Sequence, residues 1–453
     1  MWVLREEVGL EHVDAIARYM AYGVDHGCGR CIGMELEHFM VTKEGQRPVA
    51  YDDDPQSGAP GVRRVLERLR PLYRDVIIET QPDGSENLIG LSREYCTITL
   101  EPGAQFEISM GPVWELGDLY EMYRRFRVEL DAVLDEFGYE LVELGYHPVA
   151  CARDIPLIPK NRYRFMDEYF RDTGQHGICM MRATASTQVS IDYTSLEDAV
   201  SKFRVATALT PLFAFITDNS PVFEGQRVGR RELGPTHGSG RVTDTGLVVP
   251  YRMTRTAVWD DVDAQRCMTA PGVFEDGFGF ERYAAEVLRG AAIFSVEHNE
   301  WGEKRSVQRK GLTFEEVFSG RELDCADVEH ILSLYFYDVR FKTYIEIRAA
   351  DSLPFAYALA YAALVKGLFY EPGTVGALAA RFAGLDAAAV ARAKRALCEE
   401  GFEAVVYGMR AAEWLDELMG MAKGALEGAE AEYLEPLAAL IEGRRTLVDE
   451  GAC

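Results

Sequence analysis

The stretch Gly33-Met34-Glu35-Leu36-Glu37-His38-Phe39 alternates acidic and apolar side chains. Successive side chains of an extended strand point to opposite faces, so Glu35 and Glu37 share one face and the apolar residues share the other. A solvated edge strand would show the same pattern. The stretch therefore predicts a strand with one apolar and one acidic face, and its chemistry depends on the neighbouring strands.

Residues 97–109 predict two further strand pieces, because Pro102-Gly103 forces a bend between them. Glu101 ends the first piece. The polar face of the second piece carries Gln105, Glu107 and Ser109. A hairpin with a wet outer face is the alternative interpretation. Since magnesium prefers several oxygen ligands in octahedral geometry, glutamates from different strands that converge on one cavity indicate an ATP site.

Two later segments continue the one-sided pattern. Read as one strand, the first carries on a single face Arg182, Thr184, Ser186, Gln188, Ser190 and Asp192. Such a face suits hydrogen bonding to a flat polar ligand, although a solvated strand would look alike. The second segment carries on one face Arg340, Lys342, Tyr344, Glu346 and Arg348. Guanidinium and ammonium groups around one carboxylate indicate phosphate and metal binding, and a ladder of salt bridges is the alternative.

Composition limits the partners. The chain has 453 residues, 48% of them hydrophobic, with 73 acidic and 48 basic residues and a net charge of −25. This charge repels nucleic acid and anionic membranes, so neither is expected as a partner. ATP can still bind where arginines and a divalent metal reverse the local field. We expect small-molecule substrates and a monomer or homodimer.

The chain shows no secretory signal at its start and no apolar run near the roughly 20 residues needed to span a bilayer. We therefore expect a cytoplasmic protein. The nine cysteines predict reduced thiols rather than a disulfide framework. Cys28 and Cys31 form a C-x-x-C pair, for which zinc or redox use is the less favoured alternative.

The pattern of elements predicts an α+β fold. Apolar residues spaced three and four apart predict helices over 11–22, 118–137 and 196–217 that back a sheet. From Pro354 to Ile441 the chain becomes alanine-rich and helical, with Gly373 and Gly384 as breaks. The polar stretch 225–246 predicts either a mobile loop or a plain surface insertion. No P-loop or dinucleotide fingerprint occurs in strand-to-helix context, so any nucleotide is expected to lie on the sheet.

The residues quoted above resemble the plant and proteobacterial type of glutamate-cysteine ligases. The resemblance covers roughly Cys31 to Tyr370, in order, and its motifs lie at 33–39, 98–109, 158–163, 180–181, 187–189, 219–225, 259–263, 278–281 and 339–351. It implies a glutamine-synthetase-like catalytic fold, in which an antiparallel sheet forms a funnel with helices packed behind it. The expected division is a catalytic domain over 1–370 and a helical extension over 371–453.

The resemblance also implies roles for individual residues. The implied magnesium ligands are Glu35, Glu37, Glu101, Glu107, Gln188 and Glu346. Phosphate or acyl phosphate would be held by Arg255, Arg340 and Arg348. The substrate and ATP would be lined by Lys160, Arg162, Tyr163, Arg182, Thr184, Ser186, Lys342, Tyr344 and Trp259. The implied reaction is ATP-dependent activation of glutamate as γ-glutamyl phosphate, followed by attack of the cysteine amine.

Two segments depart from the family pattern. This chain reads Ala183-Thr184-Ala185-Ser186 where relatives read Arg-Thr-Cys-Thr, and it lacks glycines of the Arg-Gly-Ala-Asp-Gly-Gly motif at 348–353. Glycine permits close backbone approach, so these changes leave the amine open. A ligase with another amine, or an idle paralogue that binds nucleotide or amino acid, are the alternatives. The retained glutamates argue against an idle protein.

Overall fold

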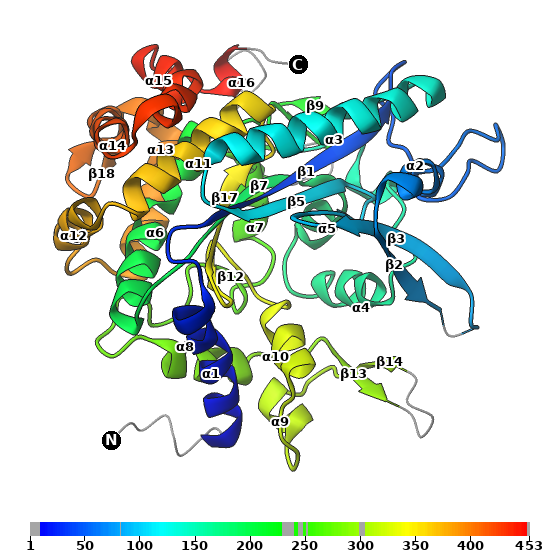
Figure 1. The fold of residues 1–453 in the computed structure, drawn as a ribbon, viewed down its shortest axis with the longest axis horizontal. Helices are drawn as coiled ribbons and strands as arrows, with labels where there is room; N and C mark the ends of the chain where they lie inside the picture. Colours follow the sequence, from blue (N-terminus) through cyan, green and yellow to red (C-terminus); the bar gives the residue numbers. More distant parts are fainter. Residues whose placement is uncertain are drawn as a thin grey trace.

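The computed structural model describes residues 10–81, 83–228, 240–242, 248–250, 252–298 and 304–450. Its centre is one nine-stranded sheet whose pairs are all antiparallel (Figure 1). The strand order is β16-β17-β7-β1-β5-β4-β3-β2, with β6 paired to β1. The strands are β1 (Ile32–Thr42), β2 (Asp75–Thr80), β3 (Glu86–Arg93), β4 (Cys96–Leu100), β5 (Phe106–Val113), β6 (Tyr139–Val142), β7 (Ser186–Ile191), β16 (Val339–Phe341) and β17 (Ile345–Asp351). The predicted α+β class with an antiparallel sheet is confirmed.

The helices account for most of the remaining described chain. They are α1 (Leu10–His26), α2 (Val62–Leu69), α3 (Leu116–Phe137), α4 (Asn161–Phe170), α5 (Gly177–Ala183), α6 (Leu196–Ile216), α7 (Thr254–Asp260), α8 (Phe280–Arg289), α9 (Phe314–Phe318), α10 (Cys325–Leu332), α11 (Phe355–Phe369), α12 (Pro372–Arg381), α13 (Ala387–Glu400), α14 (Ala411–Ala425), α15 (Glu435–Glu442) and α16 (Leu447–Glu450). The three early helices predicted from periodicity are therefore present as α1, α3 and α6.

Short two-stranded sheets lie outside the central sheet. They pair β8 (Val222–Phe223) with β9 (Gln226–Arg227), β10 (Gly240–Val242) with β11 (Val248–Pro250), β12 (Cys267–Met268) with β15 (Phe336–Tyr337), β13 (Phe294–His298) with β14 (Lys304–Gln308), and β18 (Val405–Val406) with β19 (Met409–Arg410). Most of the predicted loop at 225–246 lies outside the described residues.

The apolar face of the sheet forms the core together with α3, α6 and α11 (Figure 1). Met34 and Leu36 of β1, and Val189 of β7, are buried in this core. Because side chains alternate along each strand, the glutamates of β1 point to the opposite face. The sequence pattern alone thus separates a packed layer from a layer available for chemistry.

Helix α6 is long and apolar enough to cross a membrane by length and composition, but 83% of its most apolar window is buried inside the protein. It begins where the side chain of Ser195 accepts a hydrogen bond from the backbone N–H of Asp198. Its apolar residues pack under β17 and against α13 rather than being available to lipid.

The helices after Pro354 pack on α6 and α11. Gly384 lies between α12 and α13 with a positive φ of 81°, as expected of a glycine break. Gly373 was wrongly predicted as a break, because it lies in the first turn of α12, which begins at Pro372. The division at residue 370 stays a prediction.

Three other predictions need correction. Residues 182–192 are not one strand: α5 continues to Ala183 and β7 begins at Ser186. Residues 340–348 form a hairpin rather than one strand, with β16 and β17 joined through residues 342–344. Cys28 and Cys31 are joined as a disulfide rather than being free thiols. The hairpin still brings its polar residues together, because Arg340 and Glu346 are cross-strand partners.

Candidate active site

The polar face of the sheet is built from cross-strand rows of oxygen-bearing side chains. Glu35 of β1 lies opposite Ser109 of β5 and Gln188 of β7. Glu37 lies opposite Glu107, which in turn lies opposite Thr99 of β4. Directly opposite residues in neighbouring strands have side chains about 5 Å apart, so the register itself gathers these groups.

Four glutamates form the centre of this face, namely Glu35, Glu37, Glu101 and Glu107. Burial and the neighbouring carboxylate of Glu101 raise the pKa of Glu37 to about 7. Burial and the charges of Glu35, Glu101 and Glu37 hold the pKa of Glu107 well above its usual range. Carboxylates that repel one another in a partly buried place are suited to a divalent cation, which offsets the repulsion and accepts hard oxygen ligands.

Glu35 is placed between this acidic centre and a group of cations. Burial raises the pKa of Glu35, while the charge of Lys342 lowers it and that of Glu346 raises it. Glu35 therefore connects the acidic centre to the β16–β17 hairpin.

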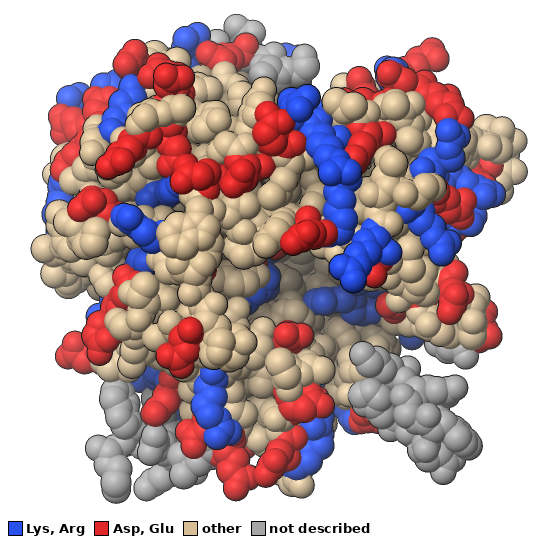
Figure 2. Space-filling view, viewed as in Figure 1, with Lys and Arg blue, Asp and Glu red and all other residues tan. Residues whose placement is uncertain are grey.

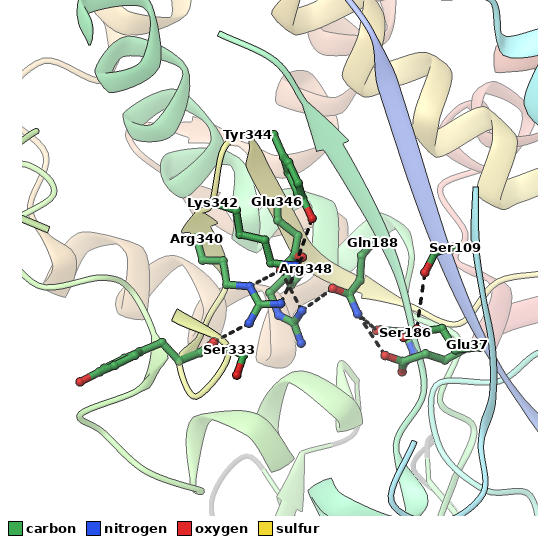
Figure 3. Close-up of polar contacts among 12 residues, drawn as sticks. Glu37, Ser109, Ser186, Gln188, Ser333, Arg340, Lys342, Tyr344, Glu346 and Arg348 are labelled. Atoms are coloured by element: carbon green, nitrogen blue, oxygen red, sulfur yellow. Dashed lines mark hydrogen bonds and ion pairs between the residues drawn. The ribbon is translucent and has the colours of Figure 1, made fainter. Parts of the chain in front are cut away.

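Glu346 is fully buried and is surrounded by three cations (Figure 3). Lys342 Nζ lies 2.7 Å from Glu346 Oε1, and Arg348 lies 2.9 Å from Oε2. Arg340 donates to Oε1 over 3.1 Å. Burial alone would raise the pKa of Glu346, but these three charges hold it well below its usual range. Glu346 is therefore ionised, and the cations exceed it by two charges.

Gln188 links the cations to the acidic centre (Figure 3). Its amide nitrogen donates to Glu37 over 3.0 Å, and its carbonyl oxygen accepts from Arg348. The backbone N–H of Ser186 donates to the other oxygen of Glu37 over 2.7 Å. Both polar ends of Gln188 are thus engaged within the protein, so it positions Glu37 and Arg348 in this structure.

Arg255 lies at the edge of the same face without a direct ion pair, although the charges of Asp351 and Glu37 favour its charged form. The side chain is 4% exposed; among the described residues its Nε has no hydrogen-bond partner, and its terminal nitrogens reach only the Arg348 carbonyl at 3.4 Å. Within the described ranges Arg255 forms no ion pair. Burial lowers its pKa. Its guanidinium lies 5.6 Å from the ring centre of Trp259, whose indole nitrogen also has no hydrogen-bond partner in the described part of the chain. A buried cation of this kind is prepared to accept an anion.

A second group lies beside Glu101. Tyr163 donates to Glu101 over 3.2 Å, and Lys160 Nζ donates to the Tyr163 hydroxyl over 3.3 Å. Burial lowers the pKa of Lys160. Arg162 donates to the backbone of Ser333 and leaves its buried Nε unpartnered. The structure therefore brings Lys160 and Tyr163 to the acidic centre through Glu101.

Two predicted substrate residues are engaged elsewhere. Arg182 lies on α5, where it forms a 2.6 Å ion pair with Asp167 and donates to the carbonyl of Ile155. The hydroxyl of Thr184 donates to the carbonyl of Met180. Neither residue lies on the strand face that was predicted to hold the substrate. The predicted strand began at Arg182, but α5 continues to Ala183 and β7 begins only at Ser186.

An open cavity of about 650 Å³ adjoins the Glu35 end of the site. Glu35, Tyr344, Ser109 and Ser190 contribute to its wall. The hydroxyl of Tyr344 accepts a 3.1 Å hydrogen bond from Lys342, so the cavity borders the cation group. Figure 2 shows a hollow in the middle of one face of the molecule, with lysine and arginine atoms on its floor despite the acidic surface around it.

Sequence reasoning missed two residues that hold the site in place. The hydroxyl of Ser352 donates to the carbonyl of Glu37 over 2.5 Å. Lys394 of α13 is 5% exposed and lies 2.8 Å from both Asp260 and Asp338. The departure from the glycine motif was visible in the sequence. A lysine on an alanine-rich helix gave no signal.

A family model described as "Glutamate-cysteine ligase family 2 (GCS2)" matches residues 31–453. The chain belongs to the glutamate-cysteine ligase family. Glutamate–cysteine ligase B, chloroplastic, from Oryza sativa subsp. japonica is 32% identical over 348 residues, which cover 75% of this chain and 62% of that protein. Glutamate–cysteine ligase, chloroplastic, from Arabidopsis thaliana is 30% identical over 377 residues, covering 82% of this chain and 65% of that protein. The chain thus spans less than two thirds of the length of these relatives.

A solved structure shows the same fold. Glutamate–cysteine ligase from Francisella tularensis in complex with AMP aligns with a TM-score of 0.54 and 11% identity, over 92% of this chain and 83% of that one. The glutamate-cysteine ligase family model also includes the C-terminal helices, because its match continues to residue 453. The earlier resemblance therefore holds beyond Tyr370, where the sequence motifs ended.

Proposed function

We propose that this protein is an ATP-dependent ligase that joins the side-chain carboxylate of glutamate to the amine of cysteine. The observation that carries the proposal is the meeting, on one sheet face, of four glutamates, three cations around Glu346 and the unpaired Arg255. Family membership supports the same activity.

The arrangement suits a transfer between two anions. The cavity bordered by Tyr344 and Glu35 is large enough for a nucleotide, with the phosphates directed toward Arg340, Lys342 and Arg348. Arg255 lies near Glu37 and Lys160 near Glu101, where each can pair with a carboxylate of an amino acid. Holding two anions along one row of glutamates positions them for reaction.

The proposed reaction has two steps. The glutamate carboxylate attacks the terminal phosphorus of ATP, which breaks the bond to ADP and forms γ-glutamyl phosphate. The amine then displaces phosphate and forms the amide. Arg348 would hold the phosphoryl oxygens, and Gln188 keeps Arg348 oriented. Magnesium, when bound by the glutamates, would supply neutralising charge on the phosphates.

The fit of magnesium rests on the donor set. Glu35, Glu37 and Glu107 offer hard oxygens on adjacent strands, and burial with mutual repulsion raises the pKa of Glu37 and Glu107. Glu346 lies close enough to Glu35 for its charge to raise the pKa of Glu35, but Lys342, Arg340 and Arg348 already engage both of its oxygens. Gln188 is a weaker candidate, since Glu37 and Arg348 already engage its amide.

A second acceptor amine is the alternative, because residues 183–186 depart from the family pattern. The discriminating experiment measures ADP release with ATP, magnesium and glutamate, adding cysteine or other amino acids and amines one at a time. We expect release with cysteine, and γ-glutamylcysteine by mass spectrometry. No ADP release with any amine would overturn the ligase proposal. ADP release with other amines but not with cysteine would overturn the proposal that cysteine is the acceptor.

A further inference from the structure

The C-x-x-C pair plays no part in the proposed reaction, yet it lies beside the site. Cys28 and Cys31 precede β1 directly, and their Cα atoms are 5.7 Å apart. Gly29 between them adopts a positive φ of 80°, which lets the chain turn tightly enough to face both sulfurs the same way. Both cysteines line the 650 Å³ cavity.

A carboxylate completes this group. Asp192 follows β7, and Ile32 of β1 pairs with Ile191 of β7, so the sheet register places Asp192 next to the cysteines. Cys28 Sγ lies 3.2 Å from Asp192 Oδ2, and the Cys31 N–H donates to the same oxygen over 3.3 Å. Among the described residues, this trio alone brings three acidic, thiol or imidazole ligand atoms within 4.8 Å of one another.

The nearby cations are engaged away from the Asp192 carboxylate. Lys202 pairs with Asp198 and donates to the Asp192 backbone carbonyl. Arg30 donates to the carbonyl of Tyr370. In the described part of the chain the Asp192 carboxylate therefore has no ion-pair partner. Lys202 and nearby backbone N–H groups favour the charged form of Asp192, but burial still raises its pKa, so a cation bound directly to its oxygens would be favourable.

We propose that reduced Cys28 and Cys31, together with Asp192, bind a thiophilic divalent cation such as Zn²⁺. Two thiolates and a carboxylate are three ligands of a tetrahedral zinc site, and the fourth position would face the cavity. The site is distinct from the glutamate centre, since Glu35 lies four residues beyond Cys31, about 13 Å at the strand rise of 3.3 Å per residue. Sulfur ligands select against magnesium, which keeps the two sites chemically separate.

The disulfide and the metal site are alternative states of the same sulfurs. Two equivalents of a low-molecular-weight thiol break the S–S bond, become a disulfide themselves and leave two protonated cysteines. Zn²⁺ then displaces both thiol protons, and no electrons are transferred in that step. The oxidised pair has no thiolate to offer, so metal binding requires prior reduction.

The test uses the full chain in both redox states, stripped of metal and titrated with Zn²⁺ or Co²⁺. We expect the reduced protein to bind one more Zn²⁺ per chain than the oxidised protein. With Co²⁺ we expect a thiolate charge-transfer absorption that excess Mg²⁺ does not remove. Cobalt held by the glutamates would lack this absorption, so the readout is independent of the ligase activity.

Variants assign the ligands. Cys28→Ser should abolish the absorption, and Asp192→Asn should weaken Zn²⁺ binding at least about tenfold, as expected for loss of a ligand. Cys325→Ser, at an exposed cysteine elsewhere, is the matched control and should change nothing. Equal Zn²⁺ binding by the oxidised and reduced wild-type protein would overturn the proposal without depending on how any variant folds. So would a thiolate absorption that persists in Cys28→Ser.

Discussion

Glu346 is completely buried and has three cationic neighbours, so its negative charge holds these cations together. We predict that Glu346→Gln lowers magnesium-dependent turnover by at least about 100-fold, the usual effect of losing a group that acts on the transferring charge. The fold should persist, because Gln keeps the shape of Glu, although Arg340, Lys342 and Arg348 lose their shared counter-charge. Steady-state ADP release and circular dichroism provide the two measurements.

Glu86→Gln is the matched control for this change, since Glu86 is an exposed carboxylate on β3 of the same sheet. It should leave turnover unchanged. A Glu346→Gln protein with wild-type turnover would remove Glu346 from the site.

Arg255 gives the opposite relation between stability and activity. Its buried guanidinium lacks an ion pair among the described residues, and its burial cost opposes the favourable effect of Asp351 and Glu37, so Arg255→Met should change the melting temperature little. The KM for glutamate should rise about 10- to 100-fold, because a charge-assisted hydrogen bond is lost.

The control for Arg255→Met is Arg74→Met, at a surface arginine whose side chain is 84% exposed. It should alter neither quantity. A large fall in melting temperature for Arg255→Met with an unchanged KM would show that Arg255 stabilises the fold and does not receive substrate.

At the level of strands, the register between β1 and β5 produces a pH dependence. Glu37 and Glu107 are cross-strand partners, and burial and the carboxylate of Glu101 raise the pKa of Glu37 to about 7. A carboxylate with a raised folded-state pKa binds its proton more tightly when folded. Its contribution to stability is therefore present at low pH and is lost as pH rises through about 7.

We predict that the metal-free protein loses up to about 3 kcal/mol of this contribution between about pH 5 and pH 8. Magnesium should reverse the trend, because it competes with protons for the same oxygens, so its affinity rises with pH. Thermal denaturation in chelator and in excess magnesium measures both effects. Glu37→Gln should flatten the metal-free dependence, and an unchanged slope in that variant would contradict the assignment.

Across the whole molecule, Lys394 connects the C-terminal helices to the site. Its ammonium lies between Asp260 and Asp338, and the Asp338 carbonyl accepts the Arg348 N–H over 2.8 Å. Burial alone would lower the pKa of Lys394, but the two carboxylates hold it above its usual range. The helical region therefore contributes a charge beneath the catalytic face as well as apolar packing.

We predict that Lys394→Met destabilises the protein by about 3–5 kcal/mol, because two buried carboxylates lose their counter-ion. The kcat should also fall, since Lys394 no longer holds Asp338, whose carbonyl accepts the Arg348 N–H. Denaturant unfolding and steady-state kinetics test these effects. Lys423→Met on α14 is the control, with a lysine 38% exposed. A loss of stability with unchanged kcat would show that Lys394 stabilises the fold without influencing the active site.

The sequence by itself determined the α+β class. It also determined which alternate residues of β1, β5 and β7 point to the polar face of the sheet, and hence most of the residues on that face. Alternation with a period of two is a local property, so it needs no knowledge of the fold. It failed at Arg182 and Thr184, because α5 and β7 meet inside a stretch whose polar spacing suits either structure.

Only the tertiary structure decided which charges are compensated. The contact of Lys394 on α13 with Asp260 and Asp338, the lack of an ion pair at Arg255 among the described residues, and the meeting of Asp192 with Cys28 all depend on residues distant in sequence. Burial and through-space charge set these properties, and neither can be read from the local order of residues.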